Sequence, residues 1–350
     1  MRLISRPCSR PGRRRSLVTL ACAFAALGLA ACGGDDSGES EEDALTVYAG
    51  RSEELIAPIF DQFTDETGIP VEVRYGESAE LLATIIEEGE NSPADIYFSQ
   101  DAGSLGAAEK EGLTAPLPNS ILNQVDPLFR SPDGGWIGTS GRVRILAYNT
   151  EALSEADLPR SIFDLTDSEW TGRIGWAPTN ASFQAFVTAM RASEGEDAAR
   201  EWLEGIVANE PVVYPDNETA RDGIAAGEVD IAPINHYYIE QAREEEGEAY
   251  PVAGYLPPGG DLGSLINVAG AAQLASSDQS REATQLIRFL LEPEAQQFFT
   301  EDTKEYPLIA GVEADPDLVP LDEIEQPDIE LSDLDDLQGT LELLQETGAL

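Results

Sequence analysis

The sequence predicts an α/β fold, and three observations support this class. Strand-like and helix-like segments alternate from residue 45 to residue 98 in the order β-α-β-α-β, which is typical of a parallel sheet covered by helices. Apolar residues make up 42% of the chain and charged residues 25%, which suits a soluble globular protein with a sizeable core. The length of 350 residues corresponds to about two domains.

The first segments follow one another through short loops. Residues 45–49 are an expected strand, and the apolar face of residues 53–68 predicts a helix that stops at Gly68 before Pro70. A second strand, a second helix and a third strand follow, at residues 71–75, 81–90 and 95–98. Ligands of parallel sheets bind at loops that leave the carboxyl ends of strands. The loops to examine are therefore 50–52, 76–78 and 99–101.

A second α/β unit is expected after a long strand-like run at residues 141–149, which is placed to cross between domains. Further strands are expected at 172–176, 212–214 and 231–234, and helices at 183–195, 197–207 and 218–227. A return strand at 270–274 precedes helices at 283–291 and 294–300, and Pro293 opens the second of these. Ser332-Asp333-Leu334-Asp335 has the pattern of a capping box and predicts the start of a last helix.

The charge and cysteine content exclude some classes of function. With 66 acidic and 21 basic residues the formal net charge is −45, and the summed field repels phosphate backbones, so no nucleic acid partner is expected. Cys8, Cys22 and Cys32 all lie near the N-terminus, which excludes thiol chemistry from the rest of the chain. The sequence contains no GxSxG or HExxH motif and has one histidine without a triad-like setting, so no enzyme is expected.

The N-terminal segment has the features of an export signal. Arginines at residues 13–15 precede the short apolar run 16–31, which is typical of a signal peptide. The run ends in Leu29-Ala30-Ala31-Cys32, which resembles a bacterial lipobox with Cys32 as the lipidated first residue. Residues 33–43 are all glycine, serine or acidic and are expected to form a flexible tether. The expected location is extracytoplasmic, lipid-anchored to the outer face of the bacterial cell membrane.

The most informative tetrapeptide for chemistry is Asn235-His236-Tyr237-Tyr238. Neighbouring side chains on a strand point to opposite faces, but both phenols can converge on one cleft where the strand ends. A phenolate is a hard oxygen donor, and a highly charged hard cation such as ferric iron can displace its proton. From the residues alone, the alternative to metal binding is a pair of tyrosines that simply pack in the core. A lone histidine such as His236 is more often a local hydrogen-bonding group than a ligand.

Several segments together resemble the ferric-iron-binding proteins of bacterial ABC transporters. They are Tyr48-Ala49-Gly50-Arg51, Pro93-Ala94-Asp95-Ile96-Tyr97-Phe98, Ser140-Gly141-Arg142-Val143-Arg144, Asn235-His236-Tyr237-Tyr238, Gly270-Ala271-Ala272, Phe289-Leu290-Leu291-Glu292-Pro293-Glu294-Ala295-Gln296 and Glu305-Tyr306-Pro307-Leu308. The resemblance covers nearly all of residues 45–350. It implies a two-lobed periplasmic-binding-protein-like fold with crossover strands between the lobes, and ferric iron held in the cleft by Tyr237 and Tyr238. The implied partners are an ABC-transporter permease and its ATPase, and the implied state is a monomer that carries ferric iron or a ferric chelate.

The match departs from the family in the first lobe. Many relatives have a histidine where Ser52 stands, and some have a glutamate where Gln100 stands. Gln100 is retained as an expected metal ligand, with the carboxylates of Asp101 and Glu77 as alternatives. Relatives commonly complete the metal shell with a bound anion, here carbonate or phosphate. The residues expected to hold it through charge-assisted bonds and helix N-termini are Arg142, Arg144, Asn180, Ser182, Asn217 and Asn235.

Alternatives remain open for these residues and for the function. The arginines could form an ordinary ion pair, and the asparagines could be helix caps. A polyamine, thiamine or a phosphonate is the alternative cargo, because one fold binds many ligands, and an enzyme on a binding-protein scaffold is the alternative from another class. The expected parts of the chain are a signal peptide (1–31), a lipidated cysteine and tether (32–43), a first lobe (44–143 and 268–310) and a second lobe (144–267 and 311–350).

Overall fold

The structure of the protein is a computed structural model that describes residues 44–247 and 249–350. The expected signal peptide, lipobox and tether lie outside these residues. Strands and helices alternate through the described part of the chain, as expected for an α/β protein. In this part no helix combines the length and the apolar character that a membrane span requires.

The first five elements are those that the sequence predicts. They are β1 (Leu45–Ala49), α1 (Glu53–Thr67), β2 (Val71–Tyr75), α2 (Ser78–Glu88) and β3 (Ile96–Ser99). Helix α1 forms because a stripe of apolar side chains faces the core, and it ends at Gly68, where a φ of 76° suits glycine. Helix α2 begins earlier than predicted, because buried Ser78 is held by a hydrogen bond from the backbone N of Gln100 (3.1 Å) that the local pattern does not show.

One seven-stranded sheet runs through the described part. Its later strands are β4 (Ile137–Asn149), β7 (Ile231–Asn235), β8 (Val252–Tyr255) and β9 (Ile266–Gln273). The strand order is β2-β1-β3-β9-β4-β7, and β8 also pairs with β4. Strand β1 is parallel to β2 and β3, but β9 is antiparallel to both of its neighbours, as β7 and β8 are to β4. The prediction of a parallel sheet is therefore wrong beyond β3, because the return strand β9 enters beside β3 in the opposite direction.

Strand β4 connects the two ends of the sheet. Residues 137–143 of β4 pair with β9, and residues 144–148 pair with β7, so a single strand passes from one end to the other. All of its residues are buried. It begins before the predicted position because the small polar residues around Gly138 read locally as a loop, whereas in the structure they pair with β9.

The β7 end of the sheet is packed mainly by helices. These are α5 (Ala181–Glu194), α6 (Glu196–Ala208), α7 (Asn217–Ala225) and α8 (Tyr237–Glu246). The Phe183 ring of α5 contacts the rings of Trp176 and of Trp202, and the second contact joins α5 to α6. The strands expected at 172–176 and 212–214 are reduced to β5 (Gly175–Trp176) and β6 (Val212–Val213), which pair in a separate two-stranded sheet.

The remaining helices include two that the sequence analysis did not predict, α3 (Ala102–Lys110) and α4 (Asn119–Leu122). Near the C-terminus lie α9 (Ser280–Phe289), α10 (Pro293–Glu301) and α11 (Leu337–Thr347). The predicted helix start at Ser332 is wrong. Residues 331–334 form a short 3-10 helix, and α11 begins after Asp336, whose carboxylate accepts a hydrogen bond from the backbone N of Gly339 (3.2 Å).

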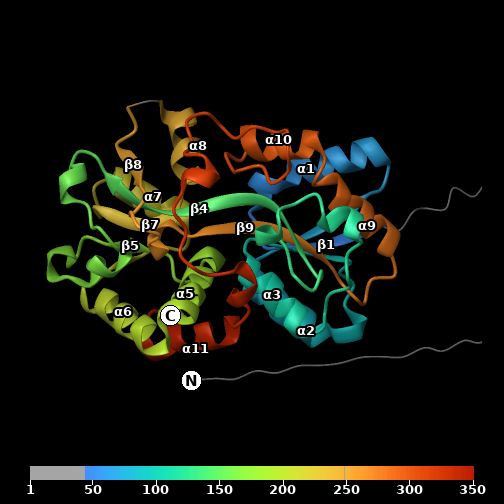
Figure 1. Ribbon diagram of the computed structural model, residues 1–350, viewed down its shortest axis with the longest axis horizontal. Helices are drawn as coiled ribbons and strands as arrows, with labels where there is room; N and C mark the ends of the chain where they lie inside the picture. Colours follow the sequence, from blue (N-terminus) through green and yellow to red (C-terminus); the bar gives the residue numbers. More distant parts are fainter. Residues whose placement is uncertain (1–43, 248) are drawn as a thin grey trace, which may run out of the picture. The chain divides into compact units, whose positions relative to one another are not determined.

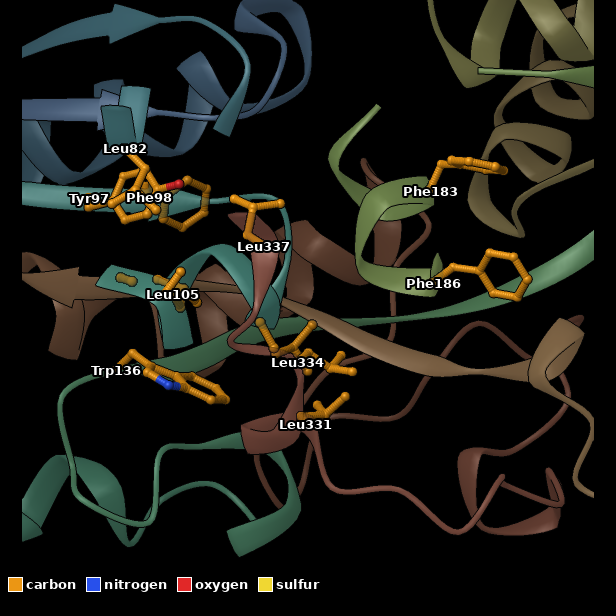
Figure 2. Close-up of a cluster of buried hydrophobic side chains, with 14 of the residues drawn as sticks. Leu82, Tyr97, Phe98, Leu105, Trp136, Phe183, Phe186, Leu331, Leu334 and Leu337 are labelled. Carbon is orange, nitrogen blue, oxygen red and sulfur yellow. The ribbon is translucent and has the colours of Figure 1, made fainter. Parts of the chain in front are cut away.

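The C-terminal segment packs against helices from both ends of the sheet. In Figure 2, Leu334 and Leu337 lie between Leu105 of α3 and Phe186 of α5, and all four side chains are buried. Figure 1 shows β4 and β9 running side by side, with α8 and α10 on one side of them and α3, α5 and α11 on the other. Residues of the loops that follow β1 and β3 line one cavity together with Tyr238, which lies just beyond β7.

Candidate ligand-binding cleft

The two adjacent tyrosines lie where strand β7 changes into helix α8. Strand β7 ends at Asn235 and α8 begins at Tyr237, so the chain turns between them and the two phenols converge. Their ring centroids are 4.3 Å apart with the planes tilted by 39°. The side-chain amide of Asn235 donates to the Tyr237 hydroxyl (3.3 Å) and to Ser182 Oγ (3.1 Å). Burial and the neighbouring Tyr237 raise the pKa of Tyr238 well above its usual value.

His236, between Asn235 and the tyrosines, makes local hydrogen bonds with both ring nitrogens. Its Nδ1 accepts a hydrogen bond from the backbone N of Val143 (3.2 Å), so Nε2 carries the proton and donates to the carbonyl of Lys304 (3.0 Å). Burial lowers the pKa of His236 to about 4. The imidazole is therefore neutral and fully engaged with the backbone, which is the structural role that a lone histidine favours.

Three buried guanidinium groups surround the tyrosine pair. Arg51 follows β1 and forms a bidentate ion pair with Glu305, with Nη–Oε distances of 3.0 Å. Arg142 donates to the carbonyl of Val268 (3.3 Å), while its Nε and Nη1 have no hydrogen-bond partner among the described residues. No nitrogen of the Arg144 guanidinium has such a partner in that part of the chain either, although the side chain is buried. Unsatisfied buried donors of this kind require an acceptor that the protein itself does not supply.

Arg144 is held by aromatic rings and not by carboxylates. Its guanidinium carbon lies 5.6 Å from the ring centroids of both Phe183 and Phe186 in α5. Burial lowers the pKa of Arg144 to about 9, and the phenols of Tyr237 and Tyr238 oppose this shift when they are ionised. Among residues 44–247 and 249–350, the ion pair expected as the alternative for Arg142 and Arg144 is limited to a 3.7 Å contact between Arg142 Nη1 and Glu305.

The expected anion-contacting amides gather around the start of α5. Asn180 is the N-cap of α5, and its Oδ1 accepts from the backbone N of Ser182 (3.0 Å) and from the side-chain amide of Asn217 (3.2 Å). The N-cap of α7 is Asp216, so Asn217 is its first helical residue. The side-chain oxygen of Asn217 is buried and has no hydrogen-bond partner among the described residues. Asn180 thus serves as a helix cap, while Asn217 retains an unused acceptor.

A cavity of 240 Å³ lies against Tyr238, whereas Tyr237 is fully buried and is not part of the cavity lining. The three loops that the sequence singles out all contribute to its wall, together with residues from the β7 end. Its polar and charged lining residues are Arg51, Ser52, Tyr75, Glu77, Gln100, Asn180, Asp216, Glu218 and Tyr238. Arg142 and Arg144 are buried behind this lining and do not reach the cavity surface.

The alternative carboxylates differ in their availability. Asp101 is the N-cap of α3, and its two oxygens accept from the backbone N (2.8 Å) and Oγ (2.9 Å) of Ser104, so it is already engaged. Glu77 lines the cavity, and burial and the charges of Glu80 and Asp216 raise its pKa. Among the described residues, no group of three or more His, Cys, Asp or Glu side chains is placed to hold a metal ion.

The Arg51–Glu305 ion pair was missed by the sequence analysis. Both residues stand in segments that carry the family resemblance, but the two are 254 positions apart and no local pattern connects them. The sequence offers an acid in Glu305-Tyr306-Pro307 and a base in Gly50-Arg51, but other charged residues stand near each of them, so neither is distinctive.

Comparison with known proteins places these features in a family. Residues 59–324 match the family described as bacterial extracellular solute-binding protein. The chain is 32% identical to the Fe(3+)-binding periplasmic protein of Serratia marcescens and 34% identical to the major ferric iron-binding protein of Neisseria meningitidis serogroup A. These matches cover 89% and 87% of this chain, respectively, and 92% of each relative. Iron-bound HitA from Pseudomonas aeruginosa is similar in structure, with a TM-score of 0.83, 37% identity, and coverage of 87% of this chain and 99% of that one. These similarities confirm the two-lobed α/β fold, and the chain belongs to the bacterial extracellular solute-binding protein family.

Proposed function

We propose that this protein captures ferric iron in the cleft and delivers it to an ABC-transporter permease with its ATPase. The observation that carries the proposal is the convergence of the Tyr237 and Tyr238 rings, 4.3 Å apart, beside the cavity. Relatives named as ferric-iron-binding proteins, which match most of this chain, support the same cargo. The protein acts by binding and release and not by turnover of its ligand.

The proposed metal ligands are Tyr237, Tyr238 and the side-chain oxygen of Gln100. Each phenol loses its proton when it binds the metal, and the resulting phenolates suit a hard trivalent cation. Gln100 lies across the cavity, where its amide oxygen is a neutral hard donor. Ser52 and Glu77 line the same wall, so a water or the Glu77 carboxylate is the next available oxygen. Three protein oxygens fill only part of the roughly six positions that a hard octahedral ion prefers.

A carbonate or phosphate anion is proposed to complete the metal shell. The support is the set of buried guanidinium nitrogens of Arg142 and Arg144 that lack an acceptor among the described residues. Hydrogen bonds join Asn180, Ser182, Asn217 and Asn235 to one another and to the Tyr237 hydroxyl at the start of α5, and the free backbone N–H groups of a helix N-terminus favour an anion. Bringing an anion to Arg144 requires a small opening of the cleft, because that side chain is buried.

The remaining parts of the proposal concern delivery. We infer that the first lobe comprises 44–143 and 268–310 and the second lobe 144–267 and 311–350, with β4 and β9 as the connections between them. An extracytoplasmic lipoprotein anchored through Cys32 and the tether 33–43 would hold this cleft, as a monomer, beside its permease. A polyamine, thiamine or phosphonate remains the second candidate cargo, and of these the unsatisfied guanidinium groups favour the anionic phosphonate.

The test replaces each phenol in turn and measures ferric iron binding. Tyr237→Phe and Tyr238→Phe should each weaken iron affinity by more than about 100-fold, because even outer partners of metal ligands change affinity by about 10–100-fold. The tyrosinate-to-iron charge-transfer band should be strongly reduced in both variants. Tyr255→Phe, in β8 outside the cavity lining, is the matched control and should keep wild-type affinity and colour. Wild-type binding in both cleft variants would contradict the proposal.

The same titration separates the anion from the protein ligands. Iron affinity of anion-depleted protein should rise when bicarbonate or phosphate is added, and this gain should be smaller in Arg142→Ala and Arg144→Ala. An affinity that is independent of anion in all three proteins would leave the iron site standing but remove the anion from it.

A further inference from the structure

The loop formed by residues 302–306 links the tyrosine-bearing corner to the opposite side of the cleft. It follows α10, and its Tyr306 pairs with Gly141 of β4 through two backbone hydrogen bonds (2.8 and 2.9 Å). Lys304 in this loop has a φ of 59°, in the left-handed region that glycine and asparagine usually occupy. A lysine keeps such a conformation only where the surrounding contacts determine it.

On one side the loop is tied to the segment that carries the tyrosine pair. His236 Nε2 donates to the Lys304 carbonyl (3.0 Å), and the side-chain amide of Gln241 donates to the Thr303 carbonyl (3.1 Å). Lys304 Nζ lies 3.0 Å from a carboxylate oxygen of Glu244 in α8. These contacts join the loop to the residue before Tyr237 and to the next two turns of α8.

On the other side the loop holds Arg51. Glu305 is fully buried, and its carboxylate accepts hydrogen bonds from both Nη atoms of Arg51 and from Thr303 Oγ1 (3.0 Å). The guanidinium carbon of Arg51 lies 6.0 Å from the centroid of the Tyr237 ring. Arg51 comes from the loop after β1, so the ion pair lies within the proposed first lobe and places its guanidinium beside a tyrosine of the second. A buried bidentate pair fixes the direction of the guanidinium more strictly than a single contact would.

We propose that Arg51 and Glu305 are positioning residues for metal capture: Glu305 holds the Arg51 cation against Tyr237, and the 302–306 loop links that contact to α8. This inference rests on the proposed iron-binding function. Neither residue ligates the metal. Glu305 fixes the direction of the Arg51 guanidinium through two hydrogen bonds, and the guanidinium in turn packs beside the Tyr237 ring and holds that ring in place.

The experiment compares iron binding in variants that change this pair. Glu305→Gln keeps the side-chain volume but leaves Arg51 as an unpaired buried charge, which can prevent folding. The double variant Arg51→Met with Glu305→Leu removes both charges, and apolar replacement of a buried pair is often neutral for stability. Arg51→Lys keeps the positive charge but loses the bidentate contact that the guanidinium makes with the carboxylate. Thr303→Val removes a single hydrogen bond to Glu305. Asp95→Asn is the matched control, because it neutralises a buried carboxylate at the opposite end of β3 from Gln100.

Ferric iron affinity and the wavelength of the tyrosinate charge-transfer band are the readouts. The double variant should bind iron about 10-fold or more weakly with a shifted band, and Arg51→Lys should lie between it and the wild type. Thr303→Val should shift the band slightly, and Asp95→Asn should leave it in place even if the melting temperature falls. The positioning role would be overturned if the double variant kept the wild-type band position and iron affinity. If only Thr303→Val folds, the same result in that variant would overturn it. A wild-type protein that gives no tyrosinate band would instead remove the iron-binding function itself.

Discussion

At the residue scale, His236 has a protonation state that its neighbours determine. The backbone N of Val143 points at Nδ1, and the carbonyl of Lys304 receives the proton on Nε2. A second proton on Nδ1 would face another donor in a buried place, so the pKa falls to about 4. The neutral ring thereby joins β4, the tyrosine corner and the 302–306 loop without adding charge to a site that already holds three guanidinium groups.

This arrangement predicts a loss of stability in mild acid. An unfolded histidine has a pKa of about 6.5, so as pH falls the unfolded state binds the proton before the folded state does. The free energy of unfolding should therefore decrease by about 2 kcal/mol through His236 alone between neutral pH and about pH 5. His236→Gln does not titrate there. Urea unfolding of both proteins across this range should show the variant less stable at neutral pH, with the difference narrowing in acid; a constant difference would contradict the neutral, buried imidazole.

At the element scale, the parts that the sequence predicts well are those with a local cause. Helix α1 shows its apolar stripe and its terminal Gly68 within one segment, and its bounds agree with the prediction. The convergence of Tyr237 and Tyr238 follows from the end of a strand at Asn235, which the apolar run before it indicates. The loop that carries Gln100 is singled out because it follows the carboxyl end of a strand, and Gln100 does line the cavity.

The parts that the sequence does not predict depend on distant partners. Helix α3 contains two glycines and has a weak local pattern, but a side chain at Gly103 would meet the carbonyl of Leu334 at 2.7 Å, so the glycine permits a close approach from the C-terminal segment. The early start of β4 needs pairing with β9, and the Arg51–Glu305 pair joins opposite parts of the chain. The start of α11 was misplaced for the same reason, since Leu331 and Leu334 are drawn into the core ahead of the helix.

The corrected start of α11 is testable through its cap. Asp336 accepts from the backbone N of Gly339 and also binds Arg191 Nη2 (2.8 Å), whereas the predicted cap Ser332 has no such bond. Asp336→Ala should lower the free energy of unfolding by about 1 kcal/mol, and Asp336→Asn by less, because asparagine still caps. Ser332→Ala is the comparison and should have little effect. If the urea midpoint fell for Ser332→Ala and not for Asp336→Ala, the helix would start at Ser332, as the sequence predicts.

At the scale of the whole molecule, the excess of negative charge is the dominant feature. With 66 acidic residues and 21 basic ones, most carboxylates have no basic partner, and their mutual repulsion opposes the compact state. The same charge draws cations toward the protein, whereas the guanidinium groups around the tyrosine pair are enclosed and matched chiefly by Glu305. The interior around Arg142 and Arg144 is therefore locally basic, whereas the cavity beside it is lined by Glu77, Asp216 and Glu218 as well as Arg51.

Screening this repulsion should stabilise the fold. The Debye length falls from about 30 Å at 0.01 M salt to about 3 Å at 1 M, so sodium chloride should raise the free energy of unfolding by on the order of 1–3 kcal/mol over that range. Most of the gain should come at the low end, because exposed charges farther apart than a Debye length no longer interact. Urea unfolding at increasing salt measures it. If the free energy of unfolding kept rising in proportion to salt concentration up to about 1 M, the cause would be exclusion of salt from the protein surface and not screening. If the urea midpoint did not change, the unpaired carboxylates would lie too far apart to repel one another.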